Sequence, residues 1–246
     1  MAIVSKEKWL YLKAIRTDEV DPSDAPALYK EFVEFLEERQ GLPAHYVRYC
    51  QTFLAMLPYL DDAPGRRVLE TGGFCDIARF LETKGFKCQR TKSDLRYSID
   101  AEDNSVDILL SLEVIEHLKD KTETQFDEVV LFRGTGVSCY ASEIERVLAP
   151  GGLVILTTPN PCSARALELL VEQKAPMVFR AHEREYTADE LAEIFCKLEI
   201  LHRTTHHSFF HLSRNLQKKW EDVFRNNNWD ASGRGDDHFM VLRKPR

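Results

Sequence analysis

The sequence lacks any long apolar run. No stretch reaches the ~18 uninterrupted apolar residues that a membrane-spanning helix requires. Residues 1–20 are charged within the first six positions and contain no long apolar core, so we expect neither a secretory signal nor a membrane anchor there. These absences predict a cytoplasmic protein with no membrane partner.

Closely spaced cysteine pairs are also missing. The six cysteines stand at positions 50, 75, 88, 139, 162 and 196, and no two of them have C-x-x-C spacing. A chain of 246 residues hides roughly 70% of its unfolded surface and needs no disulfide to hold a core. We therefore expect free thiols in a reducing, cytoplasmic compartment.

An excess of positive charge is the third absence. The formal net charge is −7, whereas nucleic-acid and anionic-membrane surfaces require clustered Lys and Arg. An apolar content of 43% and a charged content of 30% are those of an ordinary globular protein. We expect a small molecule rather than a nucleic acid as the partner, and the sequence leaves the oligomeric state open.

What the sequence does contain begins with a helical extension, predicted over residues 1–60. Pro26 opens one helix in which Leu28, Phe32 and Leu36 recur at helical spacing. A second helix after Pro43 is expected to point its aromatic residues inward. Two interpretations remain open for those aromatic residues: they pack this lid onto a core, or they line a substrate pocket.

From Arg66 onward, strand and helix patterns alternate. The run 106–112 (VDILLSL) is nearly all apolar, as a strand buried on both faces of a parallel sheet must be. A helix containing Leu148 is expected to stop at 150–152, a further strand spans 153–157, and Thr187 with Glu190 forms a capping box. This alternation predicts an α/β fold, a doubly wound and mostly parallel sheet, over residues 61–246.

Three strand ends carry residues that could take part in binding or catalysis, and ligands of such sheets bind at the carboxyl ends of the strands. The first strand leads into Glu70-Thr71-Gly72-Gly73, and Asp94 follows 22 residues after Gly72. The 106–112 strand leads into Glu113-Val114-Ile115-Glu116-His117. The next leads into Thr158-Pro159-Asn160-Pro161.

Four segments of the sequence, three of which contain these strand ends, resemble class I S-adenosylmethionine-dependent methyltransferases, particularly the type 11 and ubiquinone-biosynthesis-like O-methyltransferase groups. They are VLETGG (68–73), VDILLSLEVIEHLKD (106–120), EIERVLAPGGLVILTTPNP (143–161) and HEREYTADEL (182–191). The resemblance covers about half of the chain. It implies a Rossmann-like fold, S-adenosylmethionine as cofactor, and methyl transfer to a small-molecule acceptor, expected at oxygen.

The resemblance also implies a role for individual residues in cofactor binding. Glu70, Gly72 and Gly73 would hold the methionine end. Asp94 would bind the ribose, or flank the adenine together with Leu95. Leu112 and Glu113 would lie beside the cofactor.

The same resemblance points to residues that face the acceptor, His117 and Glu113. A hydroxyl acceptor benefits from a base, and His is the natural candidate at neutral pH. We expect His117 to act as base or positioner, with His182 next; packing or capping by these rings is the open alternative. Related ubiquinone-type proteins suggest a divalent metal at Glu113, Glu116 and His117, whose spacing would put them on one helical face.

Two departures from the family pattern matter. Phe74 stands where the second glycine of the usual G-x-G loop is expected, and only 36 residues separate Glu70 from Val106. The short interval predicts that a helix, with or without a strand, is missing there. Phe74 keeps open a nonenzymatic protein on the same fold; a nicotinamide-dependent oxidoreductase is weaker, since GGFCDI (72–77) does not supply G-x-G-x-x-G.

Overall fold

The computed structural model describes residues 26–39, 46–60, 65–73, 75–122, 134–177, 179–206 and 210–246. Its helices are α2 (Ala27–Glu38), α3 (Tyr46–Met56), η2 (Leu57–Tyr59), α4 (Asp76–Thr83), η3 (Ile115–His117), α5 (Thr135–Val147), α6 (Ala164–Val171), α7 (Ala188–Ile194) and α8 (Phe210–Asn226). Its strands are β1 (Arg67–Glu70), β2 (Lys87–Arg90), β3 (Val106–Leu112), β4 (Leu148–Pro159), β5 (Glu199–His206) and β6 (Asp237–Arg243).

The six strands form one sheet in the order β2-β1-β3-β4-β6-β5. The pairs β1–β2, β1–β3 and β3–β4 are parallel. The strand β6 runs antiparallel to both of its neighbours, β4 and β5. The predicted α/β fold with a mostly parallel sheet is therefore confirmed.

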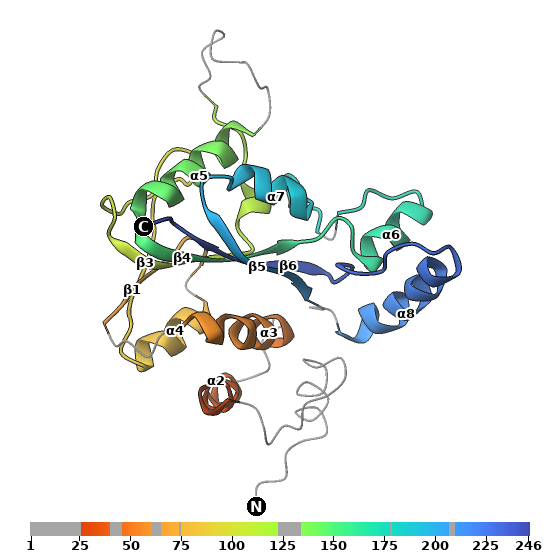
Figure 1. Cartoon of the computed structure of the whole chain (residues 1–246), viewed down its shortest axis with the longest axis horizontal. Coiled ribbons are helices and arrows are strands. Elements are labelled where there is room, and N and C mark those ends of the chain that lie inside the picture. The colour runs from red at the N-terminus through yellow and green to blue at the C-terminus, as the bar shows by residue number, and fades with distance from the viewer. Residues whose placement is uncertain are drawn as a thin grey trace, which may run out of the picture.

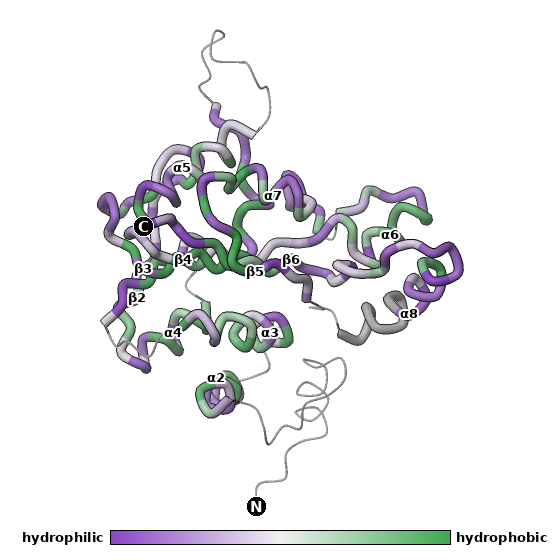
Figure 2. The backbone as a smooth tube through the Cα atoms, in the orientation of Figure 1, coloured by the Kyte–Doolittle hydropathy of each residue, from purple (hydrophilic) through white to green (hydrophobic). Residues whose placement is uncertain are grey.

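Helices cover both faces of this sheet, as a doubly wound fold requires (Figure 1). Alternate residues of β1, β3, β4 and β6 enter two separate cores because side chains of a strand point to opposite faces in turn. Ile108 and Leu110 of β3 join α2, α3 and α4 in the first core. Leu109 of β3 joins α5 and α7 in the second. The apolar band along the central strands is visible in Figure 2.

The predicted N-terminal helices are present as α2 and α3, and both pack into the first core rather than standing apart. Phe32 of α2 and Phe53 of α3 are completely buried, with ring centroids 4.2 Å apart. Phe80 of α4 contacts both rings edge-on at 5.2 and 5.3 Å. The aromatic residues of α3 that point inward thus serve packing, and the domain division at residue 60 stays a prediction.

Two local features bear on the sequence-based expectations. Residues 91–105 contain turns and no helix, which agrees with the predicted shortening between Glu70 and Val106. Leu148 was expected in a helix but starts β4, because its extended backbone pairs with Val106 of β3. The other predicted strands and helices from residue 66 onward lie within one to a few residues of their expected positions.

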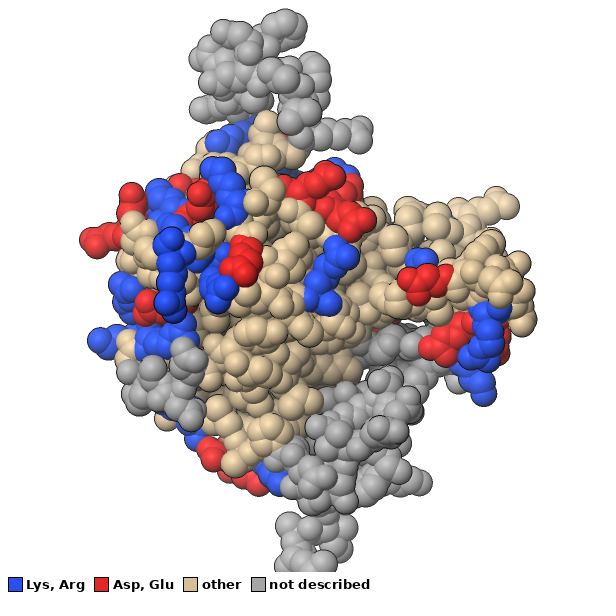
Figure 3. All heavy atoms as spheres, viewed as in Figure 1, with Lys and Arg blue, Asp and Glu red and all other residues tan. Residues whose placement is uncertain are grey.

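Beyond the main body, α6 packs against α8 at one end of the sheet (Figure 1). On the face shown in Figure 3, acidic and basic side chains are interspersed rather than segregated by sign. Among the described residues, no helix combines the length and apolar character needed to cross a bilayer.

Candidate active site

The carboxyl ends of β1, β3 and β4 meet at one edge of the sheet because these three neighbouring strands are parallel. This edge carries Glu70, Glu113 and Asn160. The antiparallel strand β6 starts there, since Asp237 pairs with Pro159. The strand ends that the sequence analysis singled out are thus brought together.

The glycine turn after β1 combines a buried carboxylate with open space. Glu70 is 1% exposed, and its carboxylate accepts a hydrogen bond of 2.9 Å from the backbone N–H of Cys75. Burial raises the pKa of Glu70 above its usual value. A Cβ at Gly72 would lie only 3.1 Å from Val114 Cγ2, whereas a Cβ at Gly73 would meet nothing within 4 Å among the described residues beyond its chain neighbours. The turn is thus packed on one side and open on the other, which fits close approach by a ligand.

Phe74 lies outside the described residues, so its effect on cofactor binding stays open. The helix α4 begins two residues later, at Asp76. The N–H groups of Ile77 and Ala78 in its first turn bond the Cys75 side chain.

The loop after β2 places Asp94 at the surface. Arg96 binds the Asp94 carboxylate through Nε at 3.0 Å and through Nη2 at 2.7 Å, and the bond to Arg96 lowers the pKa of Asp94. Leu95 is half-buried and packs on the second core. An ionised carboxylate with ordered partners suits a ribose, while the position of Leu95 leaves the adenine alternative open.

The chain turns sharply after β3, at Glu113. Its φ of +57° lies in the left-handed region, which costs a non-glycine residue roughly 1–2 kcal/mol. The Glu113 N–H donates to Thr157 O at 2.9 Å and so fixes the turn to β4. The Glu113 carboxylate forms an ion pair of 2.9 Å with Arg48 of α3, and both side chains are about 15% exposed or less.

Glu116, three residues farther on, is completely buried. Its Oε2 accepts a hydrogen bond of 2.8 Å from Thr158 Oγ1. Burial, and next the charge of Glu113, raise the pKa of Glu116 to about 8. The same two causes raise the pKa of Asp237 well above its usual value. The edge is therefore rich in carboxyl groups that burial holds close to neutrality.

The expectation that Glu113, Glu116 and His117 share one helical face is wrong. Residues 115–117 form only the short 3₁₀ turn η3, and Glu113 precedes it in a left-handed conformation. The Glu113 carboxylate therefore pairs with Arg48 and does not form one set of metal ligands with Glu116 and His117.

A different trio gathers at this place. Donor atoms of Glu116, His117 and His182 lie within 4.8 Å of one another. The two imidazole rings meet edge to face with centroids 4.8 Å apart. The loop that carries His182 is held near by the Glu183 N–H, which donates to Glu116 O at 2.8 Å. The structure thus brings the two predicted histidines together.

One ring nitrogen of His182 is paired with a carboxylate. His182 Nδ1 lies 2.8 Å from Glu185 Oε1, and both side chains are nearly inaccessible to solvent. A carboxylate that orients the far nitrogen is the usual arrangement around a metal-binding histidine. The His117 side chain is 44% exposed and faces outward, where an acceptor could reach it.

Asn160 has a structural role. Its side-chain N–H groups donate to Gly233 O and Gly235 O, both at 2.9 Å, and its Oδ1 accepts from Cys162 N–H at 2.9 Å. These bonds tie the end of β4 to the segment that leads into β6. The amide is thereby fully occupied within the protein.

The sequence analysis missed Arg48 and Asp237. A lone Arg on an amphipathic helix reads as a solvent-facing residue, and nothing local marks Arg48 as buried. Asp237 follows another Asp before an apolar run, which is typical of a turn. Only the packing of α3 and β6 against the β3–β4 edge brings these two charges to the site.

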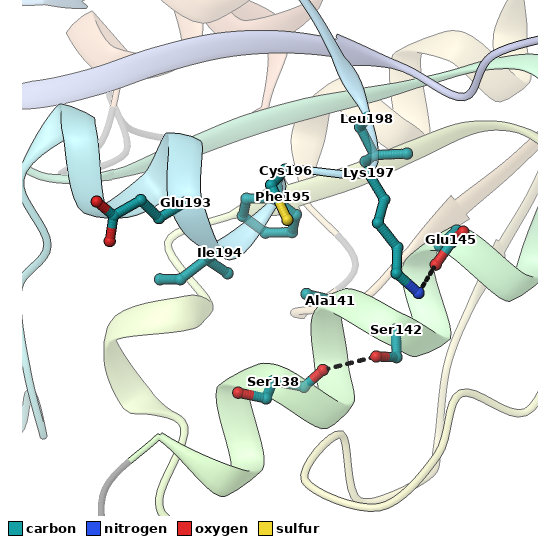
Figure 4. A pocket seen from close by; sticks show the side chains of 10 residues that line it. All are labelled: Ser138, Ala141, Ser142, Glu145, Glu193, Ile194, Phe195, Cys196, Lys197 and Leu198. Atoms are coloured by element: carbon teal, nitrogen blue, oxygen red, sulfur yellow. Dashed lines mark hydrogen bonds and ion pairs between the residues drawn. The ribbon is translucent and has the colours of Figure 1, made fainter. Parts of the chain in front are cut away.

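A pocket of about 220 Å³ opens elsewhere, between α5 and the end of α7 (Figure 4). Lys197 and Glu145 form an ion pair of 2.8 Å at its rim. Its lining shares no residue with the strand-end cluster; it consists of Ser138, Ala141, Ser142, Glu145, Glu193, Ile194, Phe195, Cys196, Lys197 and Leu198.

No protein-family model matches the sequence, and no curated protein matches it either. Solved structures, by contrast, are similar. A S-adenosylmethionine-dependent methyltransferase from Archaeoglobus fulgidus has a TM-score of 0.50 and 15% identity, over 87% of this chain and 99% of its own. A Haloferax volcanii protein in complex with the Trm112 methyltransferase activator has a TM-score of 0.50 and 14% identity, over 93% and 100%.

A third similar structure is the phosphoethanolamine N-methyltransferase 2 of Haemonchus contortus in complex with S-adenosylmethionine. It has a TM-score of 0.51 and 15% identity, over 87% of this chain and 60% of its own. At such low identity these likenesses concern the fold, and they support neither a substrate nor the type 11 or ubiquinone subgroup. The chain has the Rossmann-like fold of the class I S-adenosylmethionine-dependent methyltransferases.

Proposed function

We propose that this protein transfers the methyl group of S-adenosylmethionine to the oxygen of a small-molecule acceptor. The single observation that carries the proposal is the cradle at the strand ends. There, a buried Glu70 and an open Gly73 stand beside the strained Glu113 turn, next to two histidines. The cytoplasmic location and the absence of a nucleic-acid partner stay predictions.

The cofactor fits this cradle by space and by polarity. Several carboxyl groups lie at the edge, among them those of Glu70, Glu113 and Asp237, and carboxyl oxygens are suitable neighbours for a positive sulfonium. Glu70 and the glycine turn would hold the methionine end, Asp94 the ribose, and Leu112 would line the wall at the end of β3. When bound, S-adenosylmethionine supplies an electrophilic methyl carbon on a sulfonium leaving group.

The residues of the chain would align the acceptor and remove its proton. Alignment matters most, since effective concentrations dominate the rate gain in such displacements. His117 can accept the hydroxyl proton at neutral pH and release it to solvent through its exposed edge. His182, held by Glu185, would fix the ring of His117 by contact.

A divalent cation in the same place is the alternative to His117 acting as base, because a metal-bound imidazole nitrogen accepts no proton. Glu116, His117 and His182 offer one carboxylate and two imidazoles, a donor set that suits zinc and other first-row transition metals. Bound there, a cation would act as a Lewis acid on an acceptor oxygen. Glu185 would orient His182 as a ligand, and Thr158 would orient Glu116.

The test is methyl transfer itself. The full chain would be incubated with methyl-labelled S-adenosylmethionine and a panel of catechol, phenol, a primary alcohol and a primary amine, with and without Zn²⁺ or Mn²⁺. We expect turnover with a hydroxyl compound, lowered about 100-fold but still measurable in Glu113→Gln. Arg67→Met should leave turnover unchanged, because Arg67 lies at the opposite edge of the sheet. Turnover with the amine alone would show that the methylated atom is nitrogen rather than oxygen.

The nonenzymatic alternative has its own outcome in that experiment. If the protein binds S-adenosylhomocysteine but methylates no member of the panel, a binding or regulatory role on this fold takes the place of the enzyme.

A further inference from the structure

A charged residue of the N-terminal extension enters the cluster at the strand ends. Arg48 of α3 lies 2.9 Å from the Glu113 carboxylate, which immediately follows β3. Their side chains are 15% and 13% exposed, so this ion pair is largely removed from water. The pKa of Arg48 is raised although burial alone would lower it, because Glu113 and then Asp237 stabilise its charge.

The helix that carries Arg48 cannot easily reorient. Its neighbours Val47 and Cys50 are buried, and Phe53 one turn later is completely buried against Phe32 and Phe80. The guanidinium is therefore presented from a fixed helix. This makes its contact with Glu113 a directional constraint rather than a mobile surface ion pair.

The constraint acts on a carboxylate with one free oxygen. Arg48 binds Oε2 of Glu113, while Oε1 is buried and has no hydrogen-bond partner among the described residues. A buried, unsatisfied carboxylate oxygen is costly unless a ligand completes it. A polar group of the bound acceptor would complete it.

The constraint also acts on the backbone. Glu113 adopts its left-handed conformation between β3 and Val114, and Val114 forms the wall against Gly72. Backbone strain of this kind persists only where surrounding contacts enforce it. Two contacts do so here: the Glu113 N–H bond to Thr157 O and the ion pair with Arg48.

We propose that Arg48 is a positioning residue for the methyl transfer, holding Glu113 by one oxygen so that the other faces the acceptor, whose hydroxyl proton goes to His117. This inference rests on the proposed function. The N-terminal extension then contributes a residue to the reaction, in addition to covering one face of the sheet. Arg48 itself touches neither the methyl group nor the acceptor.

The experiment compares Arg48→Met, Arg48→Lys and Arg67→Met in the full chain. Arg67 is the matched control because it also forms an Arg–carboxylate pair, at 2.7 Å with Asp107, but at the opposite edge of the sheet. Each variant is measured for binding of S-adenosylhomocysteine by calorimetry. Each is also measured for kcat and KM with the panel acceptor that the wild type methylates fastest.

We expect Arg48→Met to lower kcat by about 10- to 100-fold, since small misplacement of a reacting group costs that much. Its dissociation constant for S-adenosylhomocysteine should stay within about threefold of the wild type, because the cofactor contacts remain. Arg48→Lys, which keeps the charge but loses the planar fork, should recover part of kcat. Arg67→Met should match the wild type in both measurements.

A double-mutant cycle separates positioning from mere stabilisation of the fold. If Arg48 acts through Glu113, adding Arg48→Met to Glu113→Gln should lower kcat by no more than about threefold further. An equally large loss in both backgrounds would overturn the inference. So would a kcat of Arg48→Met equal to that of the wild type, or a loss of cofactor binding as large as the loss of kcat.

The variants also separate this inference from the proposed function. Should Arg48→Met fail to fold, Arg48→Lys takes its place, and an unchanged kcat for Arg48→Lys then overturns the inference. A wild-type protein that binds no S-adenosylhomocysteine would refute the proposed function and this inference together. Normal binding with equal kcat values in all variants would refute this inference alone.

Discussion

The glycine turn after β1 offers a matched pair of substitutions, Gly72→Ala and Gly73→Ala. The added methyl at Gly72 would lie 3.1 Å from Val114 Cγ2, so it has to push that side chain aside. Overpacking of this kind costs about 1 kcal/mol of unfolding free energy. The methyl at Gly73 would meet none of the described residues beyond its chain neighbours within 4 Å, and a Gly→Ala change without strain stabilises by about 0.4–1 kcal/mol.

The order of the two variants in cofactor affinity should be the reverse of their order in stability: Gly73→Ala should be the more stable variant and the weaker binder. If the open side of Gly73 receives the cofactor, its methyl occupies the space of the ligand and weakens S-adenosylhomocysteine binding by about 10-fold or more, which is about 1.4 kcal/mol. Urea denaturation without ligand measures the first quantity, and calorimetric titration measures the second. Gly73→Ala protein that is as stable as the wild type and binds S-adenosylhomocysteine equally well would refute this placement of the cofactor.

Three further predictions concern the other strand ends. Asp94→Ala should weaken S-adenosylhomocysteine binding by about 10-fold without changing the urea midpoint, since the residue is exposed. Removal of its ion-pair partner by Arg96→Ala should change binding little. Equal effects of the two substitutions on binding would exclude Asp94 as the ribose ligand. The pKa of Glu116 is raised from 4.5 to about 8, so its stabilising contribution is complete below about pH 4.5 and is lost as the pH rises through 8. The unfolding free energy of the wild type, measured with a chelator present, should therefore fall between pH 5 and 8 relative to Glu116→Gln, by up to a few kcal/mol, and parallel curves would contradict the assigned pKa. Mn²⁺ binding, followed by electron paramagnetic resonance, should be lost in His182→Ala. It should be kept in His202→Ala, because His202 lies in β5 outside the trio. Equal Mn²⁺ binding by the two variants would rule out the metal site.

Much of the fold could be predicted from the sequence because its signals are local. The apolar run 106–112 becomes the central strand β3, and Thr187 with Glu190 forms the predicted capping box at α7. Gly85 follows the C-cap of α4 and has a positive φ, as glycines just past a helix end commonly do. Each of these depends on a few neighbouring residues and the spacing between them.

The candidate site was harder to predict because it depends on tertiary contacts. The spacing of Glu113, Glu116 and His117 is helical, but the ion pair with Arg48 and the bond to Thr157 hold Glu113 in a turn instead. His182 joins the trio from 65 positions away, through a loop that binds the backbone of Glu116. No periodicity in the sequence reports a contact between segments so distant.

The most direct test of the account is a calorimetric titration of S-adenosylmethionine into the purified full chain, with S-adenosylhomocysteine and NAD as comparisons. The account predicts one site with micromolar affinity for both sulfur compounds and no binding of NAD. No detectable heat with either sulfur compound, from a sample that unfolds cooperatively in urea, would contradict it.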